Sequence, residues 1–331
     1  MEAVRGSAGV LDRVVDSIPP AAGAEVMGTG IVSIALTLDG YETVSRILLV
    51  IAAVMWVTLA MLLPLRIHRD RERFRAEMRT PPALTSVAGT AVLGTRLVVL
   101  GWTWAGIAAL VIAAIMWALL IGPVLRHWKT PTVGASLILT VSTESLAVLA
   151  ATLAIVERTD WLLVVALALF VLGLCFYAFV ISRFDIRQLI VGHGDHWITG
   201  GGLAISTLAA GKLLAGAKAM AVLGGGSGVL KDVALVLWVL TMLWLPLLLV
   251  TEVVRPRFEY DVRRWSTVFP FGMYAACSFV VGAAAHAGAI TSFARVWVWI
   301  ALAVWAVVLA AMMRRGIRAV SLVRGREEGA S

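Results

Sequence analysis

The chain has 331 residues, of which 60% are hydrophobic and only 15% are charged, and its formal net charge is +8. Soluble domains carry roughly 25% charged residues and about 45–50% apolar ones, so this composition excludes a soluble globular protein. Apolar runs of about 20 residues recur along the whole chain, which indicates one domain that crosses a bilayer several times. Both cysteines, Cys175 and Cys277, lie inside apolar runs, so neither a disulfide framework nor a zinc site is expected.

In chain order, the apolar runs predict ten transmembrane helices. Helices are expected because unpaired backbone groups are too costly in hydrocarbon, and the runs lack the alternation of β-barrel strands. The predicted fold class is therefore an all-α integral membrane protein. One transmembrane domain is expected at 22–313, between an N-terminal segment at 1–21 and a basic tail at 314–331. The ten expected spans are 22–38, 44–65, 83–100, 104–122, 132–153, 161–182, 197–214, 229–250, 265–285 and 292–313.

Positive charges are unevenly distributed between the two sides of the predicted membrane domain. Of the 28 Lys and Arg residues, 21 lie in the termini and the connections on one side, and six lie on the opposite side. Because basic connections stay on the cytoplasmic side, both termini are expected in the cytoplasm. The same distribution accounts for the basic net charge without nucleic acid as a partner. A multi-pass protein of the cell membrane, surrounded by the lipid bilayer, is therefore predicted.

The odd-numbered and even-numbered spans differ in composition. Gly, Ser and Thr together number 32 in the odd spans and 8 in the even spans. Small residues let helices approach closely, and hydroxyl groups can line a wet path; plain helix packing is the alternative for any single span. All five odd spans share this bias and run in the same direction. We therefore expect them to form an inner ring around a central pore, each paired in a hairpin with an outer even span.

Ionisable residues inside the spans follow the same alternation. Glu25, Arg96, Glu144 and Lys212 all lie on odd spans. A charge within the bilayer is costly, so such residues pair with one another or face water. Glu25 and Lys212 lie near span ends, where reaching the interface is the alternative. Charge pairing and proton coupling are the two roles that we consider for Glu25, Glu144 and Lys212.

The segment before the seventh span contains residue types that bind metals. His193, Asp195 and His196 lie close together in HGDHW. Such residues at a helix start more often cap that end, and no further cluster supplies the remaining ligands. We therefore expect no metal, no cofactor and no catalytic residue, and we do not expect an enzyme.

Three segments taken together resemble one family. They are MGTGIVSIAL at 27–36, GDHWITGGGLAIS at 194–206 and RRWSTVFPFGMYAACSF at 263–279. They are similar to the tellurite-resistance/C4-dicarboxylate transporter family, which includes bacterial tellurite-resistance proteins, fungal malate and sulfite transporters, and slow-type anion channels of plant guard cells. Each segment is a weak signal alone, and their order along residues 18–313 makes the resemblance specific.

The resemblance implies five helical hairpins around a central pore, a homotrimer with one pore per protomer, and permeation of small inorganic or carboxylate anions. It also implies that a phenylalanine on the ninth helix obstructs the pore. In WSTVFPF the matching residue is Phe269, with Phe271 as the second register, and an ordinary packing role as the alternative. Pro270 would bend the helix between them.

The expected anion path follows the small and polar residues of the inner spans, whose hydroxyl and backbone N–H groups can offer partial positive charge. The resulting function is a passive anion channel gated by a phenylalanine. A carboxylate on the path would instead allow a proton-coupled carrier of C4-dicarboxylates (malate-like) or sulfite. The candidate path residues are Gly28, Thr29, Gly30, Thr90, Thr95, Arg96, Ser142, Thr143, Glu144, Gly201 and Ser206.

Overall fold

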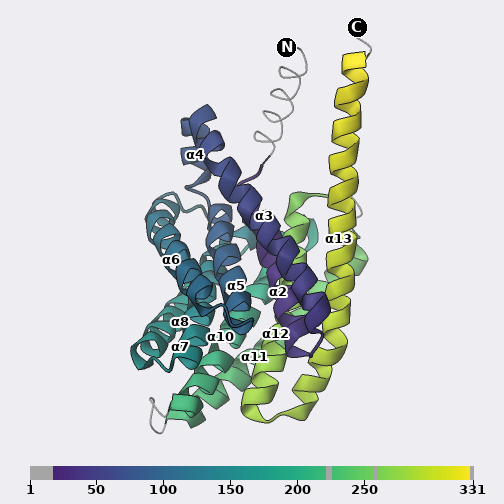
Figure 1. Ribbon diagram of the computed structural model, residues 1–331. Helices are drawn as coiled ribbons and strands as arrows, with labels where there is room; N and C mark the ends of the chain where they lie inside the picture. The colour runs from purple at the N-terminus through teal and green to yellow at the C-terminus, as the bar shows by residue number, and fades with distance from the viewer. Residues whose placement is uncertain (1–17, 221–225, 257–259, 329–331) are drawn as a thin grey trace.

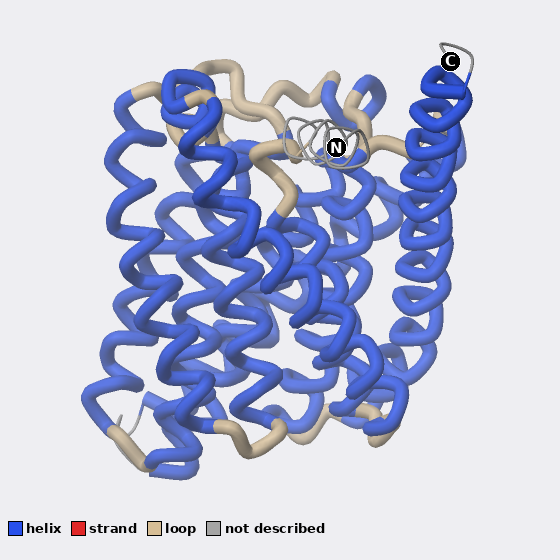
Figure 2. The backbone as a smooth tube through the Cα atoms, turned by 45° about the horizontal axis from the view of Figure 1, so that its top comes forward, coloured by secondary structure: helices blue, strands red, loops and turns tan. Residues whose placement is uncertain are grey.

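Ten apolar helices form the body of the molecule (Figure 1). The computed structural model describes residues 18–220, 226–256 and 260–328, and within these ranges the chain is helical without a β-strand (Figure 2). Nine of the described helices are long and apolar enough to cross a membrane, and α2 is a shorter apolar helix. The ten are α2 (Gly23–Leu38), α3 (Glu42–Arg69), α5 (Thr85–Val99), α6 (Thr103–Arg126), α7 (Ile138–Glu157), α8 (Asp160–Ile181), α10 (Ile198–Met220), α11 (Ser227–Val254), α12 (Trp265–Ala285) and α13 (Gly288–Glu328).

The predicted all-α fold is confirmed, and each of the ten predicted spans corresponds to one helix. Several helices are longer than their apolar runs. The last run ends at 313, whereas α13 continues to Glu328 and projects beyond the rest of the bundle in Figure 1. Hydropathy marks where the chain leaves hydrocarbon, but backbone hydrogen bonds let the helix continue into water.

Short helical segments lie in the connections. Asp70 separates α4 from the end of α3, and its side chain accepts a hydrogen bond from the Arg73 backbone N–H at 2.8 Å. Four inner helices, α5, α7, α10 and α12, each directly follow a 3₁₀ turn. The short segments are α4 (Arg71–Glu77), α9 (Gln188–Val191), η1 (Pro81–Leu84), η2 (Gly134–Leu137), η3 (Asp195–Trp197) and η5 (Val262–Arg264).

The helices form two layers, as the alternation of composition predicted. The most apolar stretches of α5, α7, α10 and α12 are 78–94% buried, and almost every residue of α2 is buried. The corresponding stretches of α3, α6, α8, α11 and α13 are only 17–28% buried, so these five helices form the outer surface. This surface is rich in exposed Leu, Ile and Val, as a lipid-facing layer requires.

The five inner helices form a closed ring. They pack in the order α2, α5, α7, α10, α12 and back to α2, and each also packs against the outer helix that follows it in the chain. All five begin at one face of the bundle, here called the N-terminal face, and end at the opposite C-terminal face. Five hairpins around a central axis are therefore confirmed.

Aromatic side chains of the outer helices link neighbouring hairpins. Each outer helix donates one hydrogen bond to the inner helix of the next hairpin, so the five bonds run around the ring. Four donors are indole N–H groups and one is a tyrosine hydroxyl. The pairs are Trp56 with Thr90 Oγ1 (2.9 Å), Trp117 with Thr143 Oγ1 (2.9 Å), Tyr177 with the Thr199 carbonyl (3.1 Å), Trp238 with Ser278 Oγ (2.8 Å) and Trp305 with Thr29 Oγ1 (3.1 Å).

Glycines permit the close approach of the inner helices to one another. A Cβ atom at Gly23 would lie 2.5 Å from the backbone of Thr85, and one at Gly89 would lie 2.9 Å from the Gly23 carbonyl oxygen. Both positions lie where α2 packs against α5. Because backbone atoms cannot rotate out of the way, a larger residue here must push the helices apart.

We therefore predict that Gly23→Ala lowers the apparent Tm of the purified protein, at a cost of about 1–3 kcal/mol. Gly122→Ala is the matched control, because a Cβ atom there would meet no described atom within 4 Å beyond its own stretch of helix. That variant should keep or slightly raise the Tm. Thermal unfolding in detergent compares the two, and equal Tm values would show that the α2–α5 contact does not depend on glycine.

Candidate functional site

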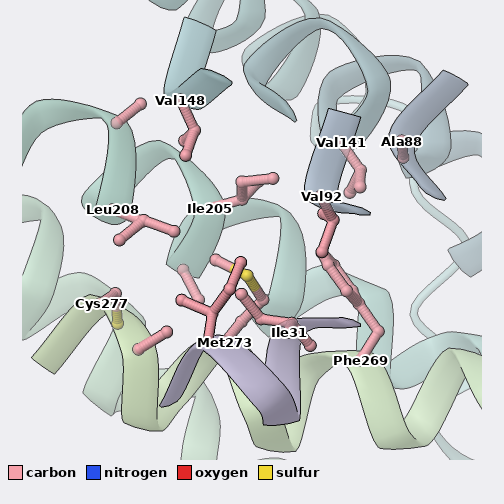
Figure 3. Close-up of a cluster of buried hydrophobic side chains, with 14 of the residues drawn as sticks. Ile31, Ala88, Val92, Val141, Val148, Ile205, Leu208, Phe269, Met273 and Cys277 are labelled. Atoms are coloured by element: carbon pink, nitrogen blue, oxygen red, sulfur yellow. The ribbon is translucent and has the colours of Figure 1, made fainter. Parts of the chain in front are cut away.

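Apolar side chains fill the centre of the helix ring (Figure 3). They come from all five inner helices and recur at spacings of three, four or seven residues, which place them on one face of each helix. Their burial makes the centre inaccessible to water in this conformation. The labelled residues are Ile31 of α2, Ala88 and Val92 of α5, Val141 and Val148 of α7, Ile205 and Leu208 of α10, and Phe269, Met273 and Cys277 of α12.

The two candidate gate residues point in different directions. Phe269 is fully buried in the central cluster, with Met273 and Cys277 on the same face of α12. Phe271 instead stacks on Trp297 of α13, with ring centroids 5.4 Å apart and an interplanar angle of 12°. It also lies 4.6 Å from the ring of Trp197. The structure therefore places Phe269 on the axis and Phe271 between α12 and its outer helix.

Pro270 and the candidate glycines lie at contacts between inner helices. Proline lacks an N–H, so Pro270 removes one hydrogen bond from the interior of α12. A Cβ atom at Gly201 would lie 2.7 Å from Pro270 Cγ, which brings α10 against α12. Cβ atoms at Gly28 and Gly30 would lie 3.2 Å from Val268 Cγ1 and 2.9 Å from Val92 Cγ1. These glycines close the ring by permitting short distances between helices.

The start of α12 is held by a local ion pair. Asp261 accepts a hydrogen bond from the Arg263 backbone N–H at 2.9 Å and pairs with its guanidinium at 2.7 Å. These hydrogen bonds hold the pKa of the Asp261 carboxyl below its ordinary value. These contacts cap the 3₁₀ turn η5, from which the helix that carries Phe269 continues.

Three candidate path hydroxyls face the outer helices. Thr29, Thr90 and Thr143 are the acceptors of the indole N–H groups of α13, α3 and α6. Thr29 also lies 3.8 Å from the sulfur of Met55 on α3. Their oxygens thus join the two helix layers.

The remaining candidate hydroxyls donate their protons within the protein. Thr95 donates to the Ala91 carbonyl at 2.9 Å, and Ser142 donates to the Leu139 carbonyl at 3.1 Å. Ser206 lies 2.9 Å from Glu144 Oε1 and 3.1 Å from the carbonyl of Gly202. Thr95 is three residues from Val92 and shares its central face, but its hydroxyl proton is already used.

Arg96 is fully buried between α2, α3 and α5. Its Nη2 lies 2.9 Å from both carboxylate oxygens of Glu42, and its Nε lies 2.9 Å from Ser45 Oγ and 3.3 Å from Ser33 Oγ. Arg46 binds the same carboxylate at 2.8 Å. Arg96 therefore extends outward from the ring and pairs with a residue that sequence reasoning missed. Glu42 precedes its expected span by two positions, and its i,i+4 spacing to Arg46 was the available signal.

We predict that Glu42→Gln destabilises the protein by about 1–2 kcal/mol, because it leaves the buried Arg96 guanidinium without its carboxylate, while the partial exposure of Glu42 lets water offset part of the loss. The double variant Glu42→Gln/Arg96→Met should lose less than the sum of the two single variants. Apparent Tm values in detergent measure both effects. Strict additivity would mean that the pair makes no energetic contribution.

Glu144 lies away from the axis, between α7, α8 and α10. It is fully buried, its Oε1 accepts the Ser206 hydrogen bond, and its Oε2 makes no hydrogen bond with any described residue. A Cβ atom at Gly173 would lie 2.5 Å from Oε1, so the glycine leaves room for the carboxyl group. Glu25 is half-buried at the start of α2, and Lys212 is half-buried on α10. Among the described residues, none of these three forms a salt bridge.

The HGDHW segment anchors a helix start. Asp195 accepts hydrogen bonds from the backbone N–H groups of Ala135 and His193, both at 3.3 Å. His196 lies 3.8 Å from Glu252 of α11. In the described ranges, no three His, Cys, Asp or Glu side chains are arranged to hold a metal ion. The motif therefore ties the start of α10 to α7 and α11.

Comparison with known proteins gives one family and two relatives. A family model described as voltage-dependent anion channel matches residues 17–313. Two uncharacterized membrane proteins of Mycobacterium tuberculosis, MT1776 of strain CDC 1551 / Oshkosh and Rv1735c of strain H37Rv, are each 32% identical over 124 residues. The alignment spans 36% of this chain and 62% of each relative, which is less than two thirds of the relative's length.

Proposed function

The chain belongs to the voltage-dependent anion channel (SLAC1) family, and we propose that it is a passive anion channel whose central path is obstructed by Phe269. The observation that carries this proposal is the position of Phe269 on the axis, within an apolar centre supplied by all five inner helices. Membership of this family confirms the resemblance found in the sequence. Permeant ions are expected to be small inorganic or carboxylate anions.

Closure in this channel has two physical causes. The ring of Phe269 blocks the axis sterically. The surrounding apolar side chains disfavour water, so an anion that entered the centre would have to give up its hydration shell. Movement of Phe269 away from the axis would admit water between Val92, Ile205 and Met273. The aligned dipoles of five parallel helices are positive at the N-terminal face, which attracts anions to that mouth.

We further propose that the protein lies in the cell membrane with its N-terminal face and both termini in the cytoplasm. The excess of Lys and Arg in the connections at this face supports the orientation. Assembly as a homotrimer, with one path in each protomer, follows from the family resemblance.

Anion current should depend on the side chain at position 269. Phe269→Ala removes the ring from the axis and should raise anion current by at least about tenfold, since each 1.4 kcal/mol of barrier changes a rate tenfold. The measurement is current across a planar bilayer with a chloride or malate gradient and no pH gradient. The current should reverse near the equilibrium potential of the anion.

Phe271→Ala is the control for this experiment. It removes the same side chain two positions away, from the stack with Trp297 rather than from the axis. It should lower the Tm without raising the current. Equal currents in Phe269→Ala and wild type, with both proteins folded, would place the obstruction elsewhere.

A second candidate function is a proton-coupled carrier of dicarboxylates or sulfite, and Glu144 is the observation that favours it. Its carboxyl group is fully buried in a membrane helix, and among the described residues it has one hydrogen bond, from Ser206. The group opposite it on α8 is Gly173, which offers no charge. A carboxylate is costly in this setting, so the neutral acid fits best, and release of its proton would accompany a rearrangement of α7, α8 and α10.

For this carrier, Glu144→Gln should abolish the stimulation of malate uptake by external acid while retaining the fold, because Gln has the same shape. Glu157→Gln, an exposed position on the same helix, should leave the stimulation intact. Uptake into liposomes at several imposed pH gradients measures it. Acid-stimulated uptake that survives in Glu144→Gln would rule out this residue as the coupling site.

A further inference from the structure

The inner ring creates an electrostatic difficulty for anions at its C-terminal face. All five inner helices end there, so their carbonyl groups and the negative ends of their dipoles are gathered at one mouth. Negative potential repels an approaching anion. A channel with this architecture therefore needs positive charge near the C-terminal mouth.

Two cations at this face are already bound to helix ends. Lys218 Nζ lies 2.8 Å from the carbonyl oxygen of Ala284 at the end of α12. Arg158 Nη1 lies 2.9 Å from the carbonyl oxygen of Ala219 at the end of α10. These contacts offset the local carbonyl dipoles. Both cations are thereby held at helix ends, outside the proposed path.

Lys212 occupies a different position, on the face of α10 that points into the ring. It continues the spacing of Ile205 and Leu208, both of which contribute to the central cluster. Two glycines on either side of Lys212 around the helix define the direction in which Lys212 leaves α10. A Cβ atom at Gly211 would meet Val280 of α12 at 3.0 Å, and one at Gly216 would meet Leu163 of α8 at 2.7 Å. Lys212 lies between these two faces, one turn beyond Leu208 toward the C-terminal mouth.

Side chains on the inner helices become more exposed toward the C-terminal face at this level. Ile31 and Val92 are buried in the centre, whereas Leu38 and Val99, seven residues farther along the same helix faces, are 37% and 42% exposed. Lys212 is half-buried at this transition. In the described part of the chain it forms neither a hydrogen bond nor a salt bridge, so none of the described acidic groups neutralises its ammonium.

Hydroxyl groups on the neighbouring helices do not replace it. Thr152 of α7 shares the inward face with Val141 and Val148 by its spacing, and its hydroxyl donates to the Val148 carbonyl at 2.7 Å. The hydroxyl of Thr95 is used in the same way. An anion at this level thus finds oxygen lone pairs on these threonines, and the ammonium of Lys212 is the available donor.

We propose that Lys212 binds a small anion at the C-terminal end of the closed path, next to the apolar centre. This inference rests on the proposed channel function and adds the site at which an anion waits before the gate opens. The shared chemistry is a compact, singly charged oxygen or halide group, as in chloride, nitrate or one carboxylate of a dicarboxylate. A single ammonium gives weak binding, which permits release into the path.

The first test measures conduction in the Phe269→Ala background, where the gate is removed. Adding Lys212→Met should raise the half-saturating chloride concentration at the C-terminal mouth by at least about fivefold, with a smaller effect at saturation. Lys212→Arg retains the charge and should behave like the parent. Lys231→Met, at an exposed position on α11, is the control for a general loss of charge and should also leave the parent value unchanged.

A second test needs no current. Nitrate binding to the folded protein should raise the Tm of wild type and Lys231→Met with increasing concentration, and this shift should be absent in Lys212→Met. Equal shifts in all three proteins would overturn the Lys212 site. A conducting Phe269→Ala channel with unchanged saturation in Lys212→Met would overturn it and leave the channel function standing. Loss of current in every variant, with the nitrate shift retained only where Lys212 is present, would reject the channel and keep the site.

Discussion

The hydrogen bonds from outer aromatic residues to the next inner helix are the constraint on which the two-layer arrangement depends. Lipid offers apolar helices no preference for one another and no hydrogen bonds for polar groups. Each such bond contributes roughly 0.6 kcal/mol in a membrane protein, so the five together give a modest energy. Their main effect is registration, because an indole of α3 that must meet Thr90 of α5 sets both the height and the rotation of its hairpin. Repeating this bond around the ring aligns all five hairpins.

This use of hydroxyl groups means that the polar residues of the inner helices make contacts within and between helices. Thr29 and Thr143 face outward as acceptors, while Thr95 and Thr152 donate to their own helices. The glycines have a similar role, since Gly201 admits the ring of Pro270. Polar and small residues thus hold the ring together. The labelled residues of the central cluster, Phe269 among them, are apolar, and this composition makes the centre dry when closed.

The sequence was sufficient for the spans and the layers, because lipid contact and helix contact impose different compositions on the two sets of helices. It favoured Phe269 over Phe271 through the family resemblance alone, because the contacts of Phe271 with Trp197 and Trp297 involve residues that only folding brings close. It also did not identify Glu42 as the partner of Arg96, since Glu42 lies just before the apolar run and was therefore placed outside the expected span. Small and polar residues on the inner spans are expected both for close helix packing and for conduction, so composition does not distinguish the two roles. The apolar side chains on the axis have the same pattern as an ordinary hydrophobic core.

The arrangement of charges follows from the direction of the inner helices. Five parallel helices favour anions at the face where they begin and disfavour them where they end, whatever the side chains are. Arg96 cannot correct this imbalance, because Glu42 neutralises it beside α3. Glu144 would worsen it as a carboxylate on the axis, and it lies instead behind the ring next to Gly173. The proposed roles of Lys212 and Phe269 are thus separable: charge near the C-terminal mouth governs which ions accumulate, and the apolar centre governs whether they pass.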